Sequence, residues 1–287
     1  MRAQVQYSDG YWWSKDNLRL HFRDYAGDER RPPIICIPGL TRNASDFASV
    51  AARLAPTWRV ICVDLRGRGE SAYAKDSMTY APLTYVQDID ALLDKLGIKR
   101  FVAFGTSLGG LVTMLLASTE PGRIAGALLN DIGPVSEARG IDRIKSYVGK
   151  SQSWPTWVHA ARSAADLHGA AHPHFDLLDW IAHAKRLYRL TPMGKIMPDY
   201  DLRIAEALRM PAGEFDMWPA YEALGTVPLL ITRGALSDVF AAETAQEMIT
   251  RLRQAQLVTV PEVGHAPLLV EPLVVAAIDE MLAAVCS

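Results

Sequence analysis

Short, nearly continuous apolar runs recur along this chain and alternate with segments of helical spacing. Strands buried on both faces have such runs, because neither face meets water. The predicted strands are 33–38, 59–64, 100–105, 124–130, 227–232 and 256–260. The predicted helices are 44–54, 85–96, 108–118, 241–253 and 267–285. The alternation predicts right-handed βαβ units, and therefore an α/β fold whose mostly parallel central sheet is flanked by helices.

Two segments depart from this alternation. Residues 10–13 and 18–25 predict a β-hairpin with a polar turn at 15–17. From 134 to 218 the alternation is absent, although this stretch has helical spacing in places and holds many of the tryptophans and histidines. Because long structureless loops are uncommon inside a compact domain, we predict a helical cap at 134–218 on a core formed by 1–133 and 219–287.

Composition narrows the classes of protein that the chain can represent. Of 287 residues, 49% are hydrophobic and 22% charged, and the net charge is −2. With no run of lysine or arginine, we expect neither nucleic acid nor a membrane as partner. The first residues lack the apolar stretch of a signal peptide, so we expect a cytoplasmic protein. Cys36 and Cys62 lie in predicted strands, where a free thiol is expected rather than a disulfide or a zinc ligand.

The segment 105–109, Gly-Thr-Ser-Leu-Gly, lies directly after a predicted strand and directly before a predicted helix. An abrupt strand-to-helix turn strains its middle residue, and glycines two positions before and after remove the Cβ atoms that would collide. Such a turn holds the Ser107 hydroxyl out at the carboxyl end of the sheet. It also leaves the backbone N–H of Leu108 free to stabilise an oxyanion. We therefore predict Ser107 as a nucleophile.

With this turn in place, the chain resembles the α/β-hydrolase fold family over nearly its whole length outside the cap. Four landmarks occur in the family's order: 37–41 (IPGLT), 64–71 (DLRGRGES), the turn at Ser107, and the closing Gly264-His265. The resemblance implies a serine hydrolase with a cap, and it makes the Leu40 N–H the second oxyanion donor. Most relatives have His-Gly where this chain has Pro38-Gly39, and Pro38 lacks an N–H that could brace the loop. We expect a structural role for 64–71.

A general base and an acid are expected to complete the site. His265 lies between the last strand and the last helix, at the sheet edge where the fold delivers its base. Asp238 lies in the loop after strand 227–232, where the family usually carries the acid. Asp131, at the end of strand 124–130, is the alternative that some members of the fold use. Chain order fits both aspartates, and loop position favours Asp238. We interpret the cap histidines as surface or packing residues.

The predicted activity is hydrolysis of a carboxylic ester of a small, largely apolar substrate through an acyl-enzyme on Ser107. Trp154, Trp157 and Trp180 are expected to line an apolar pocket between cap and core. Arg42, just after the oxyanion loop, is placed to meet a substrate carboxylate or is a solvated surface residue. The mechanism needs no metal or organic cofactor, and its only expected partner is the small-molecule substrate. The sequence leaves a homodimer open.

Two other functions remain open at this point. A carbon–carbon bond hydrolase or an enol-lactonase has the same scaffold and triad. Many carbon–carbon hydrolases carry tryptophan directly after the base, whereas this chain has Ala266. A non-catalytic α/β-hydrolase-like binding protein is the alternative from a different class, because fold does not imply function. That alternative predicts an incomplete triad, but serine, acid and histidine are all present here.

Overall fold

The computed structural model describes residues 6–210 and 215–286. Residues 1–5, part of the segment in which no signal peptide is expected, lie outside the described residues. So do 211–214 of the predicted cap and residue 287.

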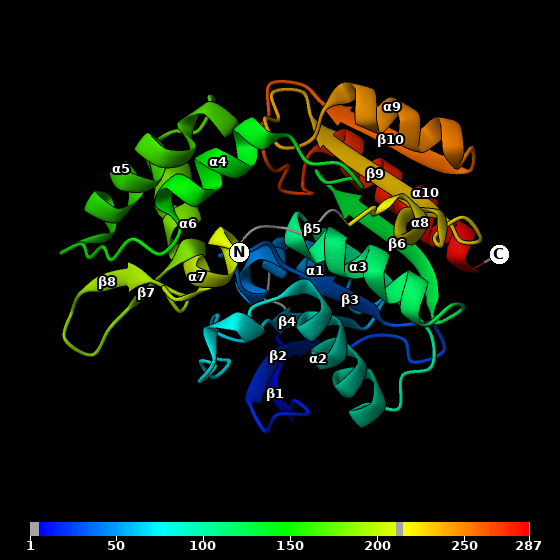
Figure 1. The fold of residues 1–287 in the computed structure, drawn as a ribbon, viewed down its shortest axis with the longest axis horizontal. Helices are drawn as coiled ribbons and strands as arrows, with labels where there is room; N and C mark the ends of the chain where they lie inside the picture. Colours follow the sequence, from blue (N-terminus) through cyan, green and yellow to red (C-terminus); the bar gives the residue numbers. More distant parts are fainter. Residues whose placement is uncertain (1–5, 211–214, 287) are drawn as a thin grey trace.

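An eight-stranded sheet forms the centre of the molecule (Figure 1). Its order is β1 (Ser8–Trp13), β2 (Arg19–Tyr25), β4 (Val60–Asp64), β3 (Ile34–Ile37), β5 (Phe101–Thr106), β6 (Ile124–Asn130), β9 (Leu229–Gly234) and β10 (Ala255–Val260). The pairs β1–β2 and β2–β4 are antiparallel, and every other pair is parallel. The predicted α/β fold with a mostly parallel sheet is confirmed.

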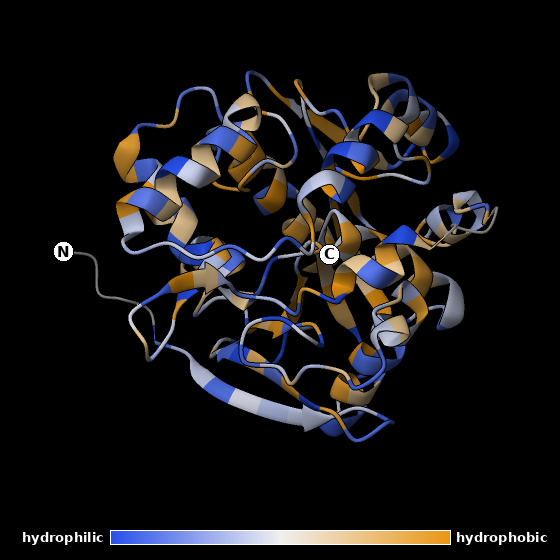
Figure 2. Ribbon diagram, turned by 60° about the vertical axis from the view of Figure 1, so that its left-hand side comes forward, coloured by the Kyte–Doolittle hydropathy of each residue, from blue (hydrophilic) through white to orange (hydrophobic). Residues whose placement is uncertain are grey.

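Helices cover both faces of the sheet. Alternate residues of a strand point to opposite faces, so Ile35 and Ile37 join one buried cluster while Ile34 and Cys36 join another. The first cluster includes residues of α2 (Pro82–Lys95), α3 (Leu108–Thr119), α8 (Trp218–Glu222) and α9 (Ala242–Arg251). The second includes residues of α1 (Ala48–Leu54) and α10 (Pro272–Cys286). Figure 2 shows hydrophobic residues gathered on the strands and on the helix faces turned toward them.

Residues 138–209, between β6 and β9, form a group of elements beside the sheet, drawn green to yellow in Figure 1. We call residues 134–218 the insertion. Its helices are α4 (Ala138–Tyr147), α5 (Trp157–His168), α6 (Leu177–Leu187) and α7 (Ile204–Arg209), and its hairpin is β7 (Tyr188–Leu190) with β8 (Ile196–Pro198). The described part of the insertion has its own small hydrophobic core, in which Trp180 packs with Leu187 and Ile196. The helices were expected from the sequence, and the hairpin was not.

The described residues contain no helix that is both long and apolar enough to cross a membrane. The three cysteines are free thiols, and Cys36 and Cys62 are buried in β3 and β4.

Candidate active site

Ser107 lies at the sharp turn between β5 and α3, with φ 52° and ψ −116°. This backbone conformation is rare for a residue with a side chain. The turn is possible because the chain is glycine on both sides. A Cβ on Gly105 would lie 2.4 Å from the Gly109 carbonyl oxygen, and one on Gly109 would lie 1.9 Å from the Ile37 oxygen. The two glycines therefore allow β3, β5 and α3 to meet closely beneath the serine.

The structure brings Ser107 and His265 together across 158 positions of sequence. Ser107 Oγ lies 2.9 Å from His265 Nε2. The other ring nitrogen, Nδ1, lies 2.7 Å from Asp131 Oδ2. A carboxylate at this distance accepts the Nδ1–H bond and leaves the Nε2 lone pair facing the serine hydroxyl. The three side chains form a serine–histidine–aspartate arrangement of the kind that activates a hydroxyl.

The carboxylate against His265 belongs to Asp131, so the preference for Asp238 is wrong. Asp131 is fully buried and also accepts hydrogen bonds from the Gly234 N–H at 2.7 Å and from the Ser237 hydroxyl at 2.6 Å. These donors stabilise the ionised carboxylate in a site that water does not reach. These contacts therefore fix the Asp131 carboxylate in place beside Nδ1 of His265.

Asp238 instead forms an ion pair with Arg143 of α4. Its oxygens lie 2.5 Å from Arg143 Nε and 2.8 Å from Nη2. The hydrogen bond from Arg143 lowers the pKa of Asp238. Loop position did not distinguish the two aspartates, because β6 and β9 are neighbours and both loops leave the same sheet edge. Ser237 occupies the place beside Asp131, and the next residue points toward the insertion's first helix.

Two backbone N–H groups are available next to the serine. Leu40 follows β3 and Leu108 begins α3, and within the described chain neither N–H has a protein acceptor. Arg68 Nε donates to the Leu40 carbonyl oxygen at 2.8 Å, from a side chain that is fully buried. This contact braces the loop that carries Leu40. Pro38 cannot do so through its own backbone, because proline has no N–H. Arg68 belongs to the glycine-rich turn 64–71, whose structural role was expected, but the sequence did not connect it with the oxyanion loop.

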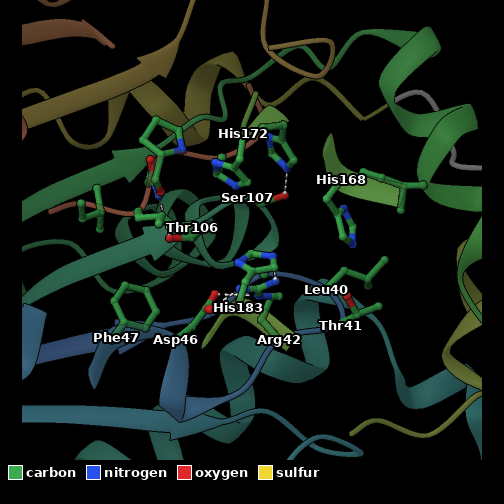
Figure 3. A pocket seen from close by; sticks show the side chains of 18 of the residues that line it. Leu40, Thr41, Arg42, Asp46, Phe47, Thr106, Ser107, His168, His172 and His183 are labelled. Atoms are coloured by element: carbon green, nitrogen blue, oxygen red, sulfur yellow. Dashed lines mark hydrogen bonds and ion pairs between the residues drawn. The ribbon is translucent and has the colours of Figure 1, made fainter. Parts of the chain in front are cut away.

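A cavity of about 100 Å³ opens beside Ser107, between the core and the insertion. Figure 3 shows Ser107, Arg42 and the imidazoles of His168, His172 and His183 around it. As expected, these three histidines pack against other rings, since His183 contacts His168, His172 and Trp180. Their rings also form the insertion's side of the cavity, which the sequence did not indicate. The other two, His159 and His174, are exposed.

The tryptophans predicted for the pocket are not among the residues that line the cavity. Trp180 is buried in the insertion's own core, and Trp154 and Trp157 pack against that core. Tryptophan side chains bury a large apolar area, and here they bury it in and against the insertion's own core. The cavity consequently has polar groups where an apolar wall was expected.

Arg42 lines the cavity and is held by Asp46 through Nε at 2.8 Å and through a second contact from Nη2. The neighbouring imidazoles are uncharged at neutral pH. Burial, together with the charges of Arg42 and Arg143, lowers the pKa of His168 to about 3. Burial and the charges of Arg42 and Arg186 lower that of His172 to about 4. Among the described residues, no group of histidine, cysteine or acidic side chains is arranged to hold a metal ion.

Comparisons with known proteins identify a family and several relatives. The model of the alpha/beta hydrolase family matches residues 34–278. A crystal structure of an alpha/beta hydrolase from Novosphingobium aromaticivorans is 52% identical, with a TM-score of 0.94 over 98% of this chain and 99% of that one. The 3-hydroxybutyrate-oligomer hydrolase of Cupriavidus necator is 32% identical over 276 residues, 90% of each chain. An sn-1-specific diacylglycerol lipase of Mus musculus is 28% identical over 86% of this chain and 80% of the lipase.

Proposed function

The chain belongs to the alpha/beta hydrolase family, and we propose on this basis that it hydrolyses a carboxylic ester through an acyl-enzyme on Ser107. The observation that carries the proposal is the continuous set of contacts from Asp131 through His265 to Ser107, at 2.7 and 2.9 Å. A serine hydroxyl alone is a weak nucleophile, and a positioned base is what activates it.

In the proposed mechanism, His265 Nε2 takes the proton of Ser107 as its oxygen attacks the ester carbonyl carbon. The N–H groups of Leu40 and Leu108 donate to the resulting oxyanion, and Asp131 stabilises the imidazolium. The proton then passes from Nε2 to the leaving alcohol as the C–O bond breaks. His265 then takes a proton from water, whose oxygen attacks the acyl carbon. The bond to Ser107 Oγ breaks, Nε2 returns the proton to the serine oxygen, and the acid is released.

The size of the cavity favours a short acyl group. A protein cavity of about 150 Å³ holds one benzene molecule, so a cavity of about 100 Å³ suits a short acyl chain and not a long one. This volume supports a small ester rather than a long-chain lipid. The name of the Cupriavidus relative, a hydrolase of hydroxybutyrate oligomers, agrees with a short acyl unit.

A fluorophosphonate probe tests the proposal, because it reacts with activated serines. We expect labelling of the intact protein, none of Ser107→Ala, and normal labelling of Ser118→Ala, a control in which an exposed hydroxyl is removed from the same helix. Equal labelling of Ser107→Ala, or none of the intact protein, would reject a nucleophilic Ser107. Kinetics on p-nitrophenyl esters, lactones and vinylogous diketones test the ester assignment, which fails if the diketones are turned over faster.

A further inference from the structure

The part of the cavity around Arg42 and His183 carries more positive than negative charge. Two guanidinium groups, those of Arg42 and Arg186, approach the single carboxylate of Asp46. Arg42 holds it in a bidentate contact, while Arg186 Nε remains 3.9 Å from Asp46 Oδ1. Arg143, the third arginine near the cavity, is neutralised by Asp238. One positive charge is therefore left over beside the cavity.

Hydrogen bonding shows the same surplus of donors. His183 lies between the two arginines, with Nε2 3.4 Å from Arg42 Nη1 and Nδ1 3.4 Å from Arg186 Nη2. A neutral imidazole has one lone pair, so it can accept from only one arginine and presents an N–H to the other. Within the described residues, Arg186 Nε is buried and has no hydrogen-bond partner. Among the described residues, therefore, Arg186 Nε and one of the two arginine N–H groups that face His183 lack an acceptor.

The surplus charge is costly in the absence of an anion. Burial lowers the pKa of Arg186, and the positive charge of Arg42 lowers it further, against the attraction of Asp46. The pKa of His183 lies well below its usual value, chiefly because of burial and then because of Arg42. An anion bound in the cavity would relieve this repulsion and accept hydrogen bonds from Arg42 Nη1 and the His183 N–H.

This cationic group lies close to the proposed nucleophile. A Cβ built on Gly39 would lie 3.3 Å from Arg42 Cγ and 3.7 Å from Ser107 Cβ, so the two side chains flank the same glycine. In Figure 3 the Arg42 and His183 side chains lie on one side of the cavity that Ser107 borders. An anion bound between them would be part of a short molecule that also reaches the serine.

We propose that the substrate is a short ester carrying a free carboxylate, and that Arg42 and His183, which line the cavity, form the subsite for that carboxylate with the charge of Arg186 beside them. The inference rests on the proposed ester hydrolysis and names its substrate class. Arg42 Nη1 donates to the carboxylate directly, the imidazole N–H of His183 donates beside it, and Arg186 supplies the balancing charge. Short hydroxy acids joined through esters, with one free acid end, are a chemical class that fits.

Two esters that differ only in charge test the subsite. Monoethyl succinate has a free carboxylate, ethyl succinamate has a neutral amide in its place, and both release ethanol. We expect kcat/KM of the wild-type protein to be about 10- to 100-fold higher for the monoethyl succinate, the range expected of a charge-assisted hydrogen bond. In Arg186→Gln this ratio should fall by about tenfold, and Arg186→Lys, which keeps the charge, should recover most of it.

The matched control is Arg162→Gln, which removes the same charge from an exposed position of α5. Its ratio should equal that of the wild-type protein. A wild-type ratio near one or below it overturns the subsite, as does an equal ratio in the Arg186→Gln and Arg162→Gln variants. If neither ester is cleaved, the proposed function fails for short esters, and calorimetric titration of Ser107→Ala decides the subsite. Selective binding of monoethyl succinate supports it, and equal binding of both compounds overturns it.

Discussion

Replacing Asp131 with asparagine tests the arrangement of the site most directly, because the change removes a charge while it keeps the shape of the side chain. Asp131 accepts from the Gly234 N–H, the Ser237 hydroxyl and His265 Nδ1. An asparagine oxygen can keep the first of these bonds, but its NH₂ group then faces the imidazole. The ring must present its lone pair at Nδ1, which moves the proton to Nε2, and Nε2–H cannot accept the proton of Ser107.

The size of the effect follows from this change of tautomer. The same substitution in a serine–histidine–aspartate site lowers kcat by about four orders of magnitude, or about 5 kcal/mol of transition-state stabilisation. Because Asp131 is fully buried, its lost charge-assisted bonds also lower the free energy of unfolding by about 1–3 kcal/mol. Asp238→Asn is the matched control. It breaks a partly exposed ion pair with Arg143, for which about 1 kcal/mol or less is expected.

Steady-state kinetics on an ester that the wild-type protein cleaves give kcat and KM for both variants, and thermal melting shows whether each is folded. We expect Asp131→Asn to lose about 10⁴-fold in kcat and Asp238→Asn to stay within tenfold of the wild-type protein. A larger loss in Asp238→Asn than in a folded Asp131→Asn would refute the assignment of Asp131 as the partner of His265.

Two further predictions concern packing and pH. In Gly109→Ala the new Cβ would lie 1.9 Å from the Ile37 carbonyl oxygen and push β3 away from α3. We expect thermal melting to show a loss of about 1–3 kcal/mol in stability, and kinetics to show a loss of about 10²-fold in activity. The control Gly169→Ala, whose Cβ meets no atom within 4 Å, should show neither loss. Folding lowers the pKa of His172 to about 4 from its usual value of 6.5, so the unfolded chain binds more protons between these two pH values. The stability contributed by this group therefore falls on acidification from pH 6.5 to 4. Denaturant unfolding at several pH values gives the slope of unfolding free energy against pH. This slope should be smaller in His172→Gln than in the wild-type protein by up to about 1.4 kcal/mol per pH unit, and equal slopes would contradict the low pKa.

Most elements of the core were predictable because their signals are local. The strand at 124–130 coincides with β6, since a run buried on both faces needs only apolar side chains. The last helix was predicted from 267 but begins at Pro272. The Glu271 carboxylate accepts the N–H groups of Leu268 and Val270, and Leu269 has φ 63°, so the chain stays non-helical up to this point. Such a side-chain contact leaves no periodic signal.

The sequence by itself determined the fold, the turn at Ser107 and the position of His265, because each depends on a strand, a loop and a helix that follow one another in the chain. Only the tertiary structure decided between Asp131 and Asp238 and placed histidines rather than tryptophans against the cavity. Those outcomes depend on contacts between segments far apart in sequence, such as Asp131 with Ser237. Local pattern predicts which edge of the sheet a side chain reaches, and packing alone selects its neighbour there.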